Sequence, residues 1–263
     1  MAGMLPTKWK SYEGKPEPNE IVDMGLAWLD QPKEKRPGFV ALYFHQTDSV
    51  GHKHGPNSPE IAASVAQVDA AMGRLVEGIH RLQLDGVANL VIVSDHGMAA
   101  ISPDRTLALC DFVDLNTVQV DFAGAVVGLR PLDGNVVALY EAFKTREKHF
   151  KAYRRETMPE RYHFRDNARI PPVVLVADDT WYFSKRSSNE PPLRGMNKGT
   201  HGFDPELDSM GATFIAWGPA FRHGETLAPV ENVHIYNLLC ATLGLKPAPN
   251  DGDDRLVKKV LAK

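Results

Sequence analysis

The chain has 263 residues, which is enough for one large α/β domain or two small ones with a sizeable core. Hydrophobic residues make up 43% and charged residues 24%, as in ordinary globular proteins, and the formal net charge of -3 excludes a basic surface for nucleic acid. Two cysteines, Cys110 and Cys240, are too few for a disulfide framework, and no apolar run approaches the roughly 20 residues that cross a bilayer.

The first part of the chain predicts an irregular lead-in, a short amphipathic segment and a strand. Residues 1–20 are rich in Lys, Pro and Glu and contain no apolar stretch typical of a signal peptide, so the chain as written is expected to stay in the cytoplasm. Ile21 to Leu29 form a short amphipathic segment. The compact apolar run FVALYF, Phe39 to Phe44, predicts a buried strand.

The next segment contains the clearest helix of the chain. Ser58-Pro59-Glu60 is typical of a helix start, with Ser as the cap and Pro at the first helical position. An apolar stripe follows at spacings of three and four and ends before Gly86; its members are Ile61, Val65, Val68, Met72, Leu75, Ile79 and Leu82. The strand NLVIVS comes next. This strand, helix, strand order is typical of a parallel sheet.

The middle of the chain, Thr117 to Ser188, has a different pattern. AVVGLRP and PVVLVAD predict strands, and the charged segment YEAFKTREKHFKAYRRETMPER between them predicts mostly a solvated helix. SSNEPPLRGMNKGTHG is a loop by composition, and ATFIAWG, Ala212 to Gly218, predicts another buried strand. Asn232 is expected to cap a last helix through Leu243 that buries the Cys240 thiol.

Three polar clusters lie beside the predicted strands, where open α/β sheets place their sites. HQTDSVGHKHGP follows FVALYF, SDHGM follows the strand NLVIV, and KGTHGFD precedes ATFIAWG. They contain Asp48 and His52, Asp95 and His96, and His201. Carboxylate oxygen and neutral imidazole nitrogen are ligands that a first-row divalent metal accepts without thiolates, and Zn²⁺ suits such mixed sets.

The spacing within the clusters is compatible with a shared metal. Asp48 and His52 are four residues apart, so a helical turn would place both side chains on one face. Asp95 and His96 can share a target only if the strand ends there, which Gly97 permits. Each signal is weak alone, because a single Asp-x-x-x-His is more often a surface pair and His201 could simply lie in a loop. Three clusters in one domain favour a metal site.

The ordered motifs resemble a known family. Asp48-x-x-x-His52, SDHGM, THGFDPELDSMGATFIAWGPAF and VENVHIYNLLCATLGLKPAPNDG closely resemble the type I phosphodiesterase/nucleotide pyrophosphatase family of the alkaline phosphatase superfamily, from about residue 20 to residue 254. The resemblance implies an α/β fold with a mostly parallel sheet flanked by helices. Residues 21–116 and 189–263 would form the catalytic domain, and residues 117–188 would be a small α/β insertion.

The resemblance also implies two zinc ions at the carboxyl ends of the sheet. Asp48, His52 and His201 match the three ligands of one zinc, and Asp95 and His96 match two ligands of the other. The family reaction passes through a covalent phosphothreonine that water then hydrolyses. His54 is expected to be a loop residue near the site; Asp104, Asp204 and NDGDD (Asn250 to Asp254) are expected to be surface residues.

The chain departs from the family at the second zinc. The family takes another aspartate and its threonine nucleophile from a segment that precedes the matched region, and neither Thr7 nor Thr47 stands in a similar motif. No catalytic nucleophile is therefore assigned, and one zinc is expected rather than two. Exposed sheet edges and apolar surface are expected where strands of a missing N-terminal portion would pair.

Three hypotheses about function follow from these observations. The chain is the C-terminal part of a zinc phosphodiesterase, a metal-binding remnant without turnover, or a phosphonoacetate hydrolase or phosphomutase of the same superfamily. The substrate would be a small phosphodiester or nucleotide, with nucleotide, dinucleotide and lipid headgroup diesters all compatible with the family. The resemblance implies export or membrane anchoring, in contrast to the cytoplasmic location expected from the chain as written.

Overall fold

The computed structural model describes residues 5–11, 13–185 and 197–262, and they form two compact units. Unit 1 comprises Met1–Thr47, Ala62–Asp95 and Thr213–Lys263, and unit 2 comprises Asp48–Ile61 and His96–Ala212. Most of the predicted loop SSNEPPLRGMNKGTHG lies outside the described residues. Unit 2 contains the middle segment together with flanking residues, and the assignment of residues 117–188 as an insertion stays a prediction.

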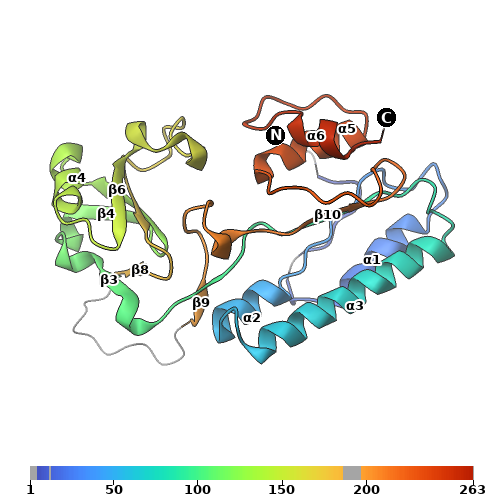
Figure 1. Ribbon diagram of the computed structural model, residues 1–263, viewed down its shortest axis with the longest axis horizontal. Coiled ribbons are helices and arrows are strands. Elements are labelled where there is room, and N and C mark those ends of the chain that lie inside the picture. The colour runs from blue at the N-terminus through green and yellow to red at the C-terminus, as the bar shows by residue number, and fades with distance from the viewer. Residues whose placement is uncertain (1–4, 12, 186–196, 263) are drawn as a thin grey trace. The chain divides into compact units, whose positions relative to one another are not determined.

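Figure 1 labels the helices and many of the strands. The helices are α1 (Pro18–Leu29), α2 (Gln46–His54), α3 (Pro59–Arg81), α4 (Val136–Lys144), α5 (Ile235–Thr242) and α6 (Arg255–Val260). The strands are β1 (Leu90–Val93), β2 (Ala99–Ala100), β3 (Thr106–Ala108), β4 (Val118–Phe122), β5 (Val126–Pro131), β6 (Phe150–Arg154), β7 (Val173–Ala177), β8 (Tyr182–Ser184), β9 (Gly199–Thr200) and β10 (Phe214–Trp217). Within the described residues, none of the helices is both long and apolar enough to cross a membrane.

Helix α3 begins as the sequence predicts. The Ser58 hydroxyl accepts a hydrogen bond from the backbone N–H of Ile61 at 3.2 Å, which satisfies one of the free donors of the first turn. The helix ends at Arg81, before the predicted limit, because Gln83 adopts a left-handed conformation with φ of 55°. Only part of the predicted stripe is buried: Leu75 and Ile79 are core residues, whereas Val65 is exposed.

Helices α1 and α3 form one core of unit 1. Val22 and Leu26 of α1 pack with Ala71, Leu75 and Ile79 of α3. Gly78 permits this close approach, because a Cβ atom there would lie 2.4 Å from the methyl groups of Leu26. The early amphipathic segment is therefore a helix that depends on tertiary burial of one face.

The prediction of a buried strand at Phe39 to Phe44 is wrong. This segment is not a strand, and the side chains of Phe39 and Tyr43 are exposed. Leu42 and Phe44 pack against the α1 and α3 core, so exposed and half-buried residues alternate along the segment. It therefore has the alternation of a strand without the hydrogen-bond ladder that defines one.

The prediction of a mostly parallel sheet is not confirmed. Strands β1 and β10 coincide with NLVIVS and ATFIAWG but pair antiparallel, with Leu90 opposite Trp217 and Val93 opposite Phe214. Since residues 39–44 form no strand, the parallel pair expected around α3 does not form. The described strands form sheets of two or four strands. Among the described strand pairs, only β3 and β8 run parallel.

The last predicted helix of unit 1 forms as α5, but it begins later than predicted. Asn232 lies in a short 3-10 turn, and the residue that precedes the first turn of α5 is His234, without a side-chain cap. The buried thiol of Cys240 is confirmed, and neither cysteine forms a disulfide. Helix α6, which the sequence pattern did not predict, packs Leu256 and Val260 against Leu238 and Phe221.

Unit 2 contains a four-stranded antiparallel sheet in the order β4-β5-β7-β6. All five residues of β7 are buried, because alternate side chains enter two different cores on the two faces of the sheet. Helix α4 covers one face of this sheet (Figure 1). Its Phe143 side chain is buried beside Phe150. The predicted strands AVVGLRP and PVVLVAD are confirmed as β5 and β7.

The prediction that the charged segment between β5 and β7 is mostly helix is wrong. Helix α4 ends at Lys144, and β6 follows and pairs with β7 along its whole length. Phe150 and Ala152 alternate with exposed residues and face the core. Buried and exposed side chains alternate along β6. The burial of every second side chain on the sheet outweighs the helix preference of the neighbouring charged residues.

Candidate metal centre

Helix α2 supplies the first two side chains of a polar cluster in unit 2. Asp48 lies in its first turn and His52 one turn later, so both project from the same face. The Oδ1 atom of Asp48 and the Nε2 atom of His52 are 3.3 Å apart. The helical placement predicted from the four-residue spacing is therefore confirmed.

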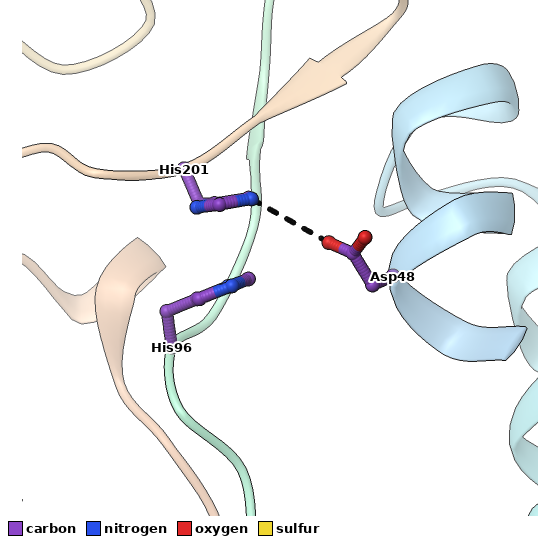
Figure 2. Close-up of side chains that lie close together, drawn as sticks. All are labelled: Asp48, His96 and His201. Carbon is purple, nitrogen blue, oxygen red and sulfur yellow. Dashed lines mark ion pairs between the residues drawn. The ribbon is translucent and has the colours of Figure 1, made fainter. Parts of the chain in front are cut away.

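A short strand pair adds two further histidines. Strand β9 ends one residue before His201, and its partner β2 begins three residues after His96. The imidazole rings of His96 and His201 stack, with centroids 3.4 Å apart and planes tilted by 12°. Figure 2 shows the two rings on separate stretches of chain, with Asp48 opposite them on α2.

The approach of α2 to β9 depends on glycine. A Cβ atom at Gly199 would lie 2.5 Å from the carbonyl oxygen of Gly51, which real structures do not allow. The contact is held by two hydrogen bonds: His52 Nδ1 to the Gly199 carbonyl at 2.9 Å, and Lys198 N–H to the His52 carbonyl at 2.8 Å. Helix α2 therefore lies against β9 in a fixed register.

Three ligand atoms converge with the spacing of a tetrahedral site. His52 Nε2 and His201 Nε2 are 3.1 Å apart, and Asp48 Oδ1 lies 3.3 Å from the former and 3.5 Å from the latter. Metal bonds of about 2.0–2.1 Å in a tetrahedral arrangement place ligand atoms about 3.3 Å apart. The three observed distances agree with that value.

Hydrogen bonds at the other ring nitrogens fix which atoms face the cluster. A backbone carbonyl can only accept, so His52 Nδ1 donates to the Gly199 carbonyl and His96 Nδ1 donates to the Gly97 carbonyl at 2.8 Å. In a neutral imidazole this leaves a lone pair on Nε2. Metal-binding histidines are typically held by such a bond from the second nitrogen.

The Asp48 carboxylate supports the same interpretation. Its Oδ1 atom is buried and has no hydrogen-bond partner among the described residues, although two imidazole nitrogens lie close to it. Burying an ionised oxygen without a hydrogen bond is costly, and a bound cation would remove that cost. Ligand atoms of Asp48, His96 and His201 also lie within 4.8 Å of one another, which makes these residues a group able to hold a metal ion.

The remaining candidates are placed differently. Asp95 ends a segment of unit 1, so its role in a metal site stays a prediction. His54 lies at the end of α2, where its Nδ1 atom is 3.4 Å from a carboxylate oxygen of Glu60. Asp48, His52, His96 and His201 are therefore the predicted ligands that unit 2 brings together.

Asp204, expected to be a surface residue, is instead half-buried in a network. Its carboxylate accepts hydrogen bonds from Arg161 Nη2 at 2.6 Å, from Arg161 Nε at 3.3 Å and from the Tyr162 hydroxyl at 2.6 Å. Burial raises the pKa of Asp204, but these hydrogen bonds outweigh burial and hold the pKa below its usual value. The signal available in the sequence was its position three residues after His201.

Comparison with known proteins identifies relatives along nearly the whole chain. The chain is 36% identical to mouse ectonucleotide pyrophosphatase/phosphodiesterase family member 1 over 271 residues, which cover 99% of this chain and 30% of the relative. It is also 36% identical to a venom phosphodiesterase from Naja atra, covering 95% of this chain and 31% of the relative. The chain thus spans about a third of the curated relatives it matches.

Solved structures agree with the sequence relatives. Human ectonucleotide pyrophosphatase/phosphodiesterase 5 superposes with a TM-score of 0.90 at 28% identity, covering 99% of this chain and 68% of that chain. An inactive variant of the murine protein, in complex with AMP, gives a TM-score of 0.88 at 30% identity and covers 98% of this chain and 67% of that one. The chain therefore has the fold of these alkaline-phosphatase-like hydrolases.

A family model matches most of the chain. The model described as type I phosphodiesterase/nucleotide pyrophosphatase matches residues 3–204, a range that includes Asp48, His52, His96 and His201. Proteins of this family are phosphodiesterases and nucleotide pyrophosphatases, which are hydrolases. The chain belongs to the type I phosphodiesterase/nucleotide pyrophosphatase family.

Proposed function

We propose that this chain provides a zinc-binding part of an enzyme that hydrolyses phosphodiester or nucleotide pyrophosphate bonds. Asp48, His52 and His201 are the ligands of one Zn²⁺ in this proposal, as the family resemblance of the sequence implies. The observation that carries it is the convergence of one carboxylate oxygen and two imidazole nitrogens at 3.1 to 3.5 Å, with the carboxylate oxygen buried and without a hydrogen-bond partner in the part of the chain that the structure describes.

The side chains have separate roles in this proposal. His52 presents Nε2 because its Nδ1 is held by the Gly199 carbonyl, and Asp48 contributes the negative charge that offsets part of the metal charge. His96 stacks on His201 and restricts its ring orientation. A bound Zn²⁺ supplies Lewis-acid stabilisation of charge on phosphoryl oxygens, which phosphoryl transfer requires.

The proposal also includes a second zinc ion. Asp95 and His96 are proposed as two of its ligands, with the remaining ligand and the threonine nucleophile supplied outside the matched motifs. His96 supports this assignment, because its Nδ1 donates to a backbone carbonyl and its ring lies beside the first site. With two ligands from this chain, we expect the second zinc to bind more weakly than the first.

The substrate class is proposed from the relatives. Two relatives are named for nucleotide pyrophosphatase/phosphodiesterase and venom phosphodiesterase activity, and the murine structure is described in complex with AMP. A small phosphodiester or nucleotide is therefore the proposed substrate. The mouse and human relatives are named ectonucleotide enzymes, that is, enzymes outside the cell. These names are weak evidence against the cytoplasmic location expected from the sequence.

Metal binding is the direct test of the proposed site. Titration calorimetry of the metal-free chain with Zn²⁺, together with Co²⁺ absorption spectra, should show a tetrahedral site in the wild type. His52→Ala should lower the Zn²⁺ affinity by at least about 10-fold. His223→Ala, which removes an exposed histidine of unit 1, is the matched control and should bind Zn²⁺ as the wild type does.

Turnover is tested separately from binding. With a chromogenic phosphodiester and Zn²⁺, we expect little or no hydrolysis by this chain, since no threonine of the described residues is assigned as the nucleophile. Robust hydrolysis that survives His52→Ala would contradict the proposed site. Preference for phosphonoacetate over diesters would instead support the alternative superfamily activity.

A further inference from the structure

We propose that Asp204, held by Arg161 and Tyr162, positions the loop that carries His201 and so sets the metal affinity of the candidate centre. The inference rests on the proposed metal centre, because positioning matters only if His201 is a ligand. Asp204 does not itself belong to the ligand cluster. Its role is that of a positioning residue, and it acts on His201 through the two residues of backbone between them.

The contacts of Asp204 are numerous for a side chain outside the ligand cluster. Both carboxylate oxygens accept from the Arg161 guanidinium, one also accepts from the Tyr162 hydroxyl, and the other accepts from the backbone N–H of Glu206 at 3.1 Å. A guanidinium bound through two nitrogens to one carboxylate fixes orientation as well as distance. The network therefore restrains the carboxylate and the chain direction around it.

Arg161 is itself restrained on its other sides. Its guanidinium lies over the Tyr162 ring, 4.6 Å from the centroid, and donates to the Tyr162 hydroxyl at 3.1 Å. Its Nε atom is also 3.5 Å from a carboxylate oxygen of Glu206. Two acidic side chains on the segment after His201 therefore converge on one cation from the segment Glu160–Tyr162.

The loop between Asp204 and His201 is short and fixed at both ends. Gly202 has φ of 94°, a conformation that residues with a Cβ atom rarely adopt, and Phe203 is 5% exposed within the main core of unit 2. Before His201, β9 is paired with β2. A shift of Asp204 would pass through Phe203 and Gly202 to the His201 ring, whose Nε2 atom needs placement within a few tenths of an ångström for a metal bond.

The protonation states of Asp204 and Tyr162 support the positioning role of Asp204. Burial raises the pKa of Asp204, but the bonds from Arg161 and Tyr162 hold it below its usual range, and the pKa of Tyr162 is raised by burial and by the Asp204 carboxylate. The aspartate is thus charged and the tyrosine protonated at neutral pH. Each group keeps the protonation state that the hydrogen bonds require.

Asp204→Asn tests the proposal, because it keeps the shape of the side chain and removes its charge. We expect the Zn²⁺ affinity measured by calorimetry to fall about 10-fold, with a change in the Co²⁺ spectrum. Arg161→Lys, which keeps the charge and loses the two-nitrogen contact, should have an intermediate effect. Asp121→Asn is the matched control: it breaks an ion pair with Arg130 in the same unit, so Zn²⁺ affinity should stay at the wild-type value.

A purely structural role predicts a different result. In that case Asp204→Asn and Asp121→Asn would lower the melting temperature while the folded protein kept its Zn²⁺ affinity, and this outcome would overturn the proposal. An equal loss of affinity in both variants would also overturn it, since the effect would not be specific to the His201 loop.

Hydrogen exchange on the metal-free protein keeps the two proposals distinguishable. If Asp204 positions the loop, Asp204→Asn should speed amide exchange in the segment that contains His201, and Asp121→Asn should not. A wild type that binds no Zn²⁺ would refute the metal centre, and with it the proposed control of affinity. Faster exchange would then still show that Asp204 holds the loop, whereas unchanged exchange would refute that step independently of zinc.

Discussion

The Nε2 atoms of His52 and His201 lie 3.1 Å apart, although the two residues are separated by 149 positions in the sequence. The ring of His52 reaches this position because its Nδ1 is bonded to the Gly199 carbonyl, two residues before His201. The same backbone segment thus positions one histidine and carries the other. This link makes the candidate metal centre sensitive to small changes in the packing of α2 on β9.

Asp48→Asn should weaken Zn²⁺ binding without destabilising the metal-free protein. The Oδ1 atom is buried and has no hydrogen-bond partner among the described residues, so replacing the carboxylate by an amide removes a ligand without breaking a hydrogen bond. We expect at least about a 10-fold loss of Zn²⁺ affinity by calorimetry and an equal or higher melting temperature without metal. Asp69→Asn, at an exposed position of α3, should change neither quantity.

Gly199→Ala should displace α2 from β9. The added Cβ atom would lie 2.5 Å from the Gly51 carbonyl, and backbone on both sides must move to relieve this contact. We expect a loss of stability of about 1–3 kcal/mol in denaturant unfolding and a loss of the tetrahedral Co²⁺ spectrum. Gly73→Ala, at an open position on α3, is the control and should slightly stabilise the protein because alanine favours a helix. Retention of the Co²⁺ spectrum in Gly199→Ala would contradict the proposed role of this contact.

Removal of metal should lower the stability of the protein reversibly. A ligand that binds only the folded state at 100 times its dissociation constant adds about 2.7 kcal/mol to the free energy of unfolding. The melting temperature should therefore rise with Zn²⁺, fall on addition of a chelator and return when Zn²⁺ is restored. His52→Ala should show a smaller response, because a 10-fold loss of affinity at the same Zn²⁺ concentration lowers the added free energy of unfolding to about 1.4 kcal/mol. A response of wild-type size in that variant would assign the metal to other residues.

Phe143→Ala should strongly destabilise unit 2. The ring is fully buried, stacks on Phe112 at a centroid distance of 5.2 Å and packs beside Phe150. Truncation leaves a cavity, and we expect a loss of about 3–5 kcal/mol in denaturant unfolding. Val137→Ala, an exposed position on the same helix α4, should cost much less, and similar losses for the two variants would contradict the described core.

The stability difference between the wild type and Asp204→Asn should depend on pH. Because the folded-state pKa of Asp204 lies below its ordinary value of 3.8, its carboxylate stabilises the fold above that value and loses this effect as the pH falls through the folded-state pKa. Urea unfolding should therefore show a larger difference at pH 7 than at pH 3. A difference that grows on acidification would contradict the charged network with Arg161 and Tyr162.

The sequence by itself determined the local chemistry of this protein. A four-residue spacing placed Asp48 and His52 on one helical face, and the ordered motifs were sufficient to indicate the family. The Ser58 cap and the buried runs of β5 and β7 were likewise predictable, because capping and continuous apolar patterns depend on neighbouring residues. These features need no knowledge of distant contacts.

Only the tertiary structure decided the rest. Phe39 to Phe44 has strand-like alternation but forms no strand, and β6 forms where charge suggested a helix, because a strand exists only if another strand supplies its hydrogen bonds. The network of Asp204 with Arg161 depends on two segments 43 residues apart. The convergence of His201 on α2 likewise depends on the absence of a side chain at Gly199, a steric condition visible only when both backbones are in place.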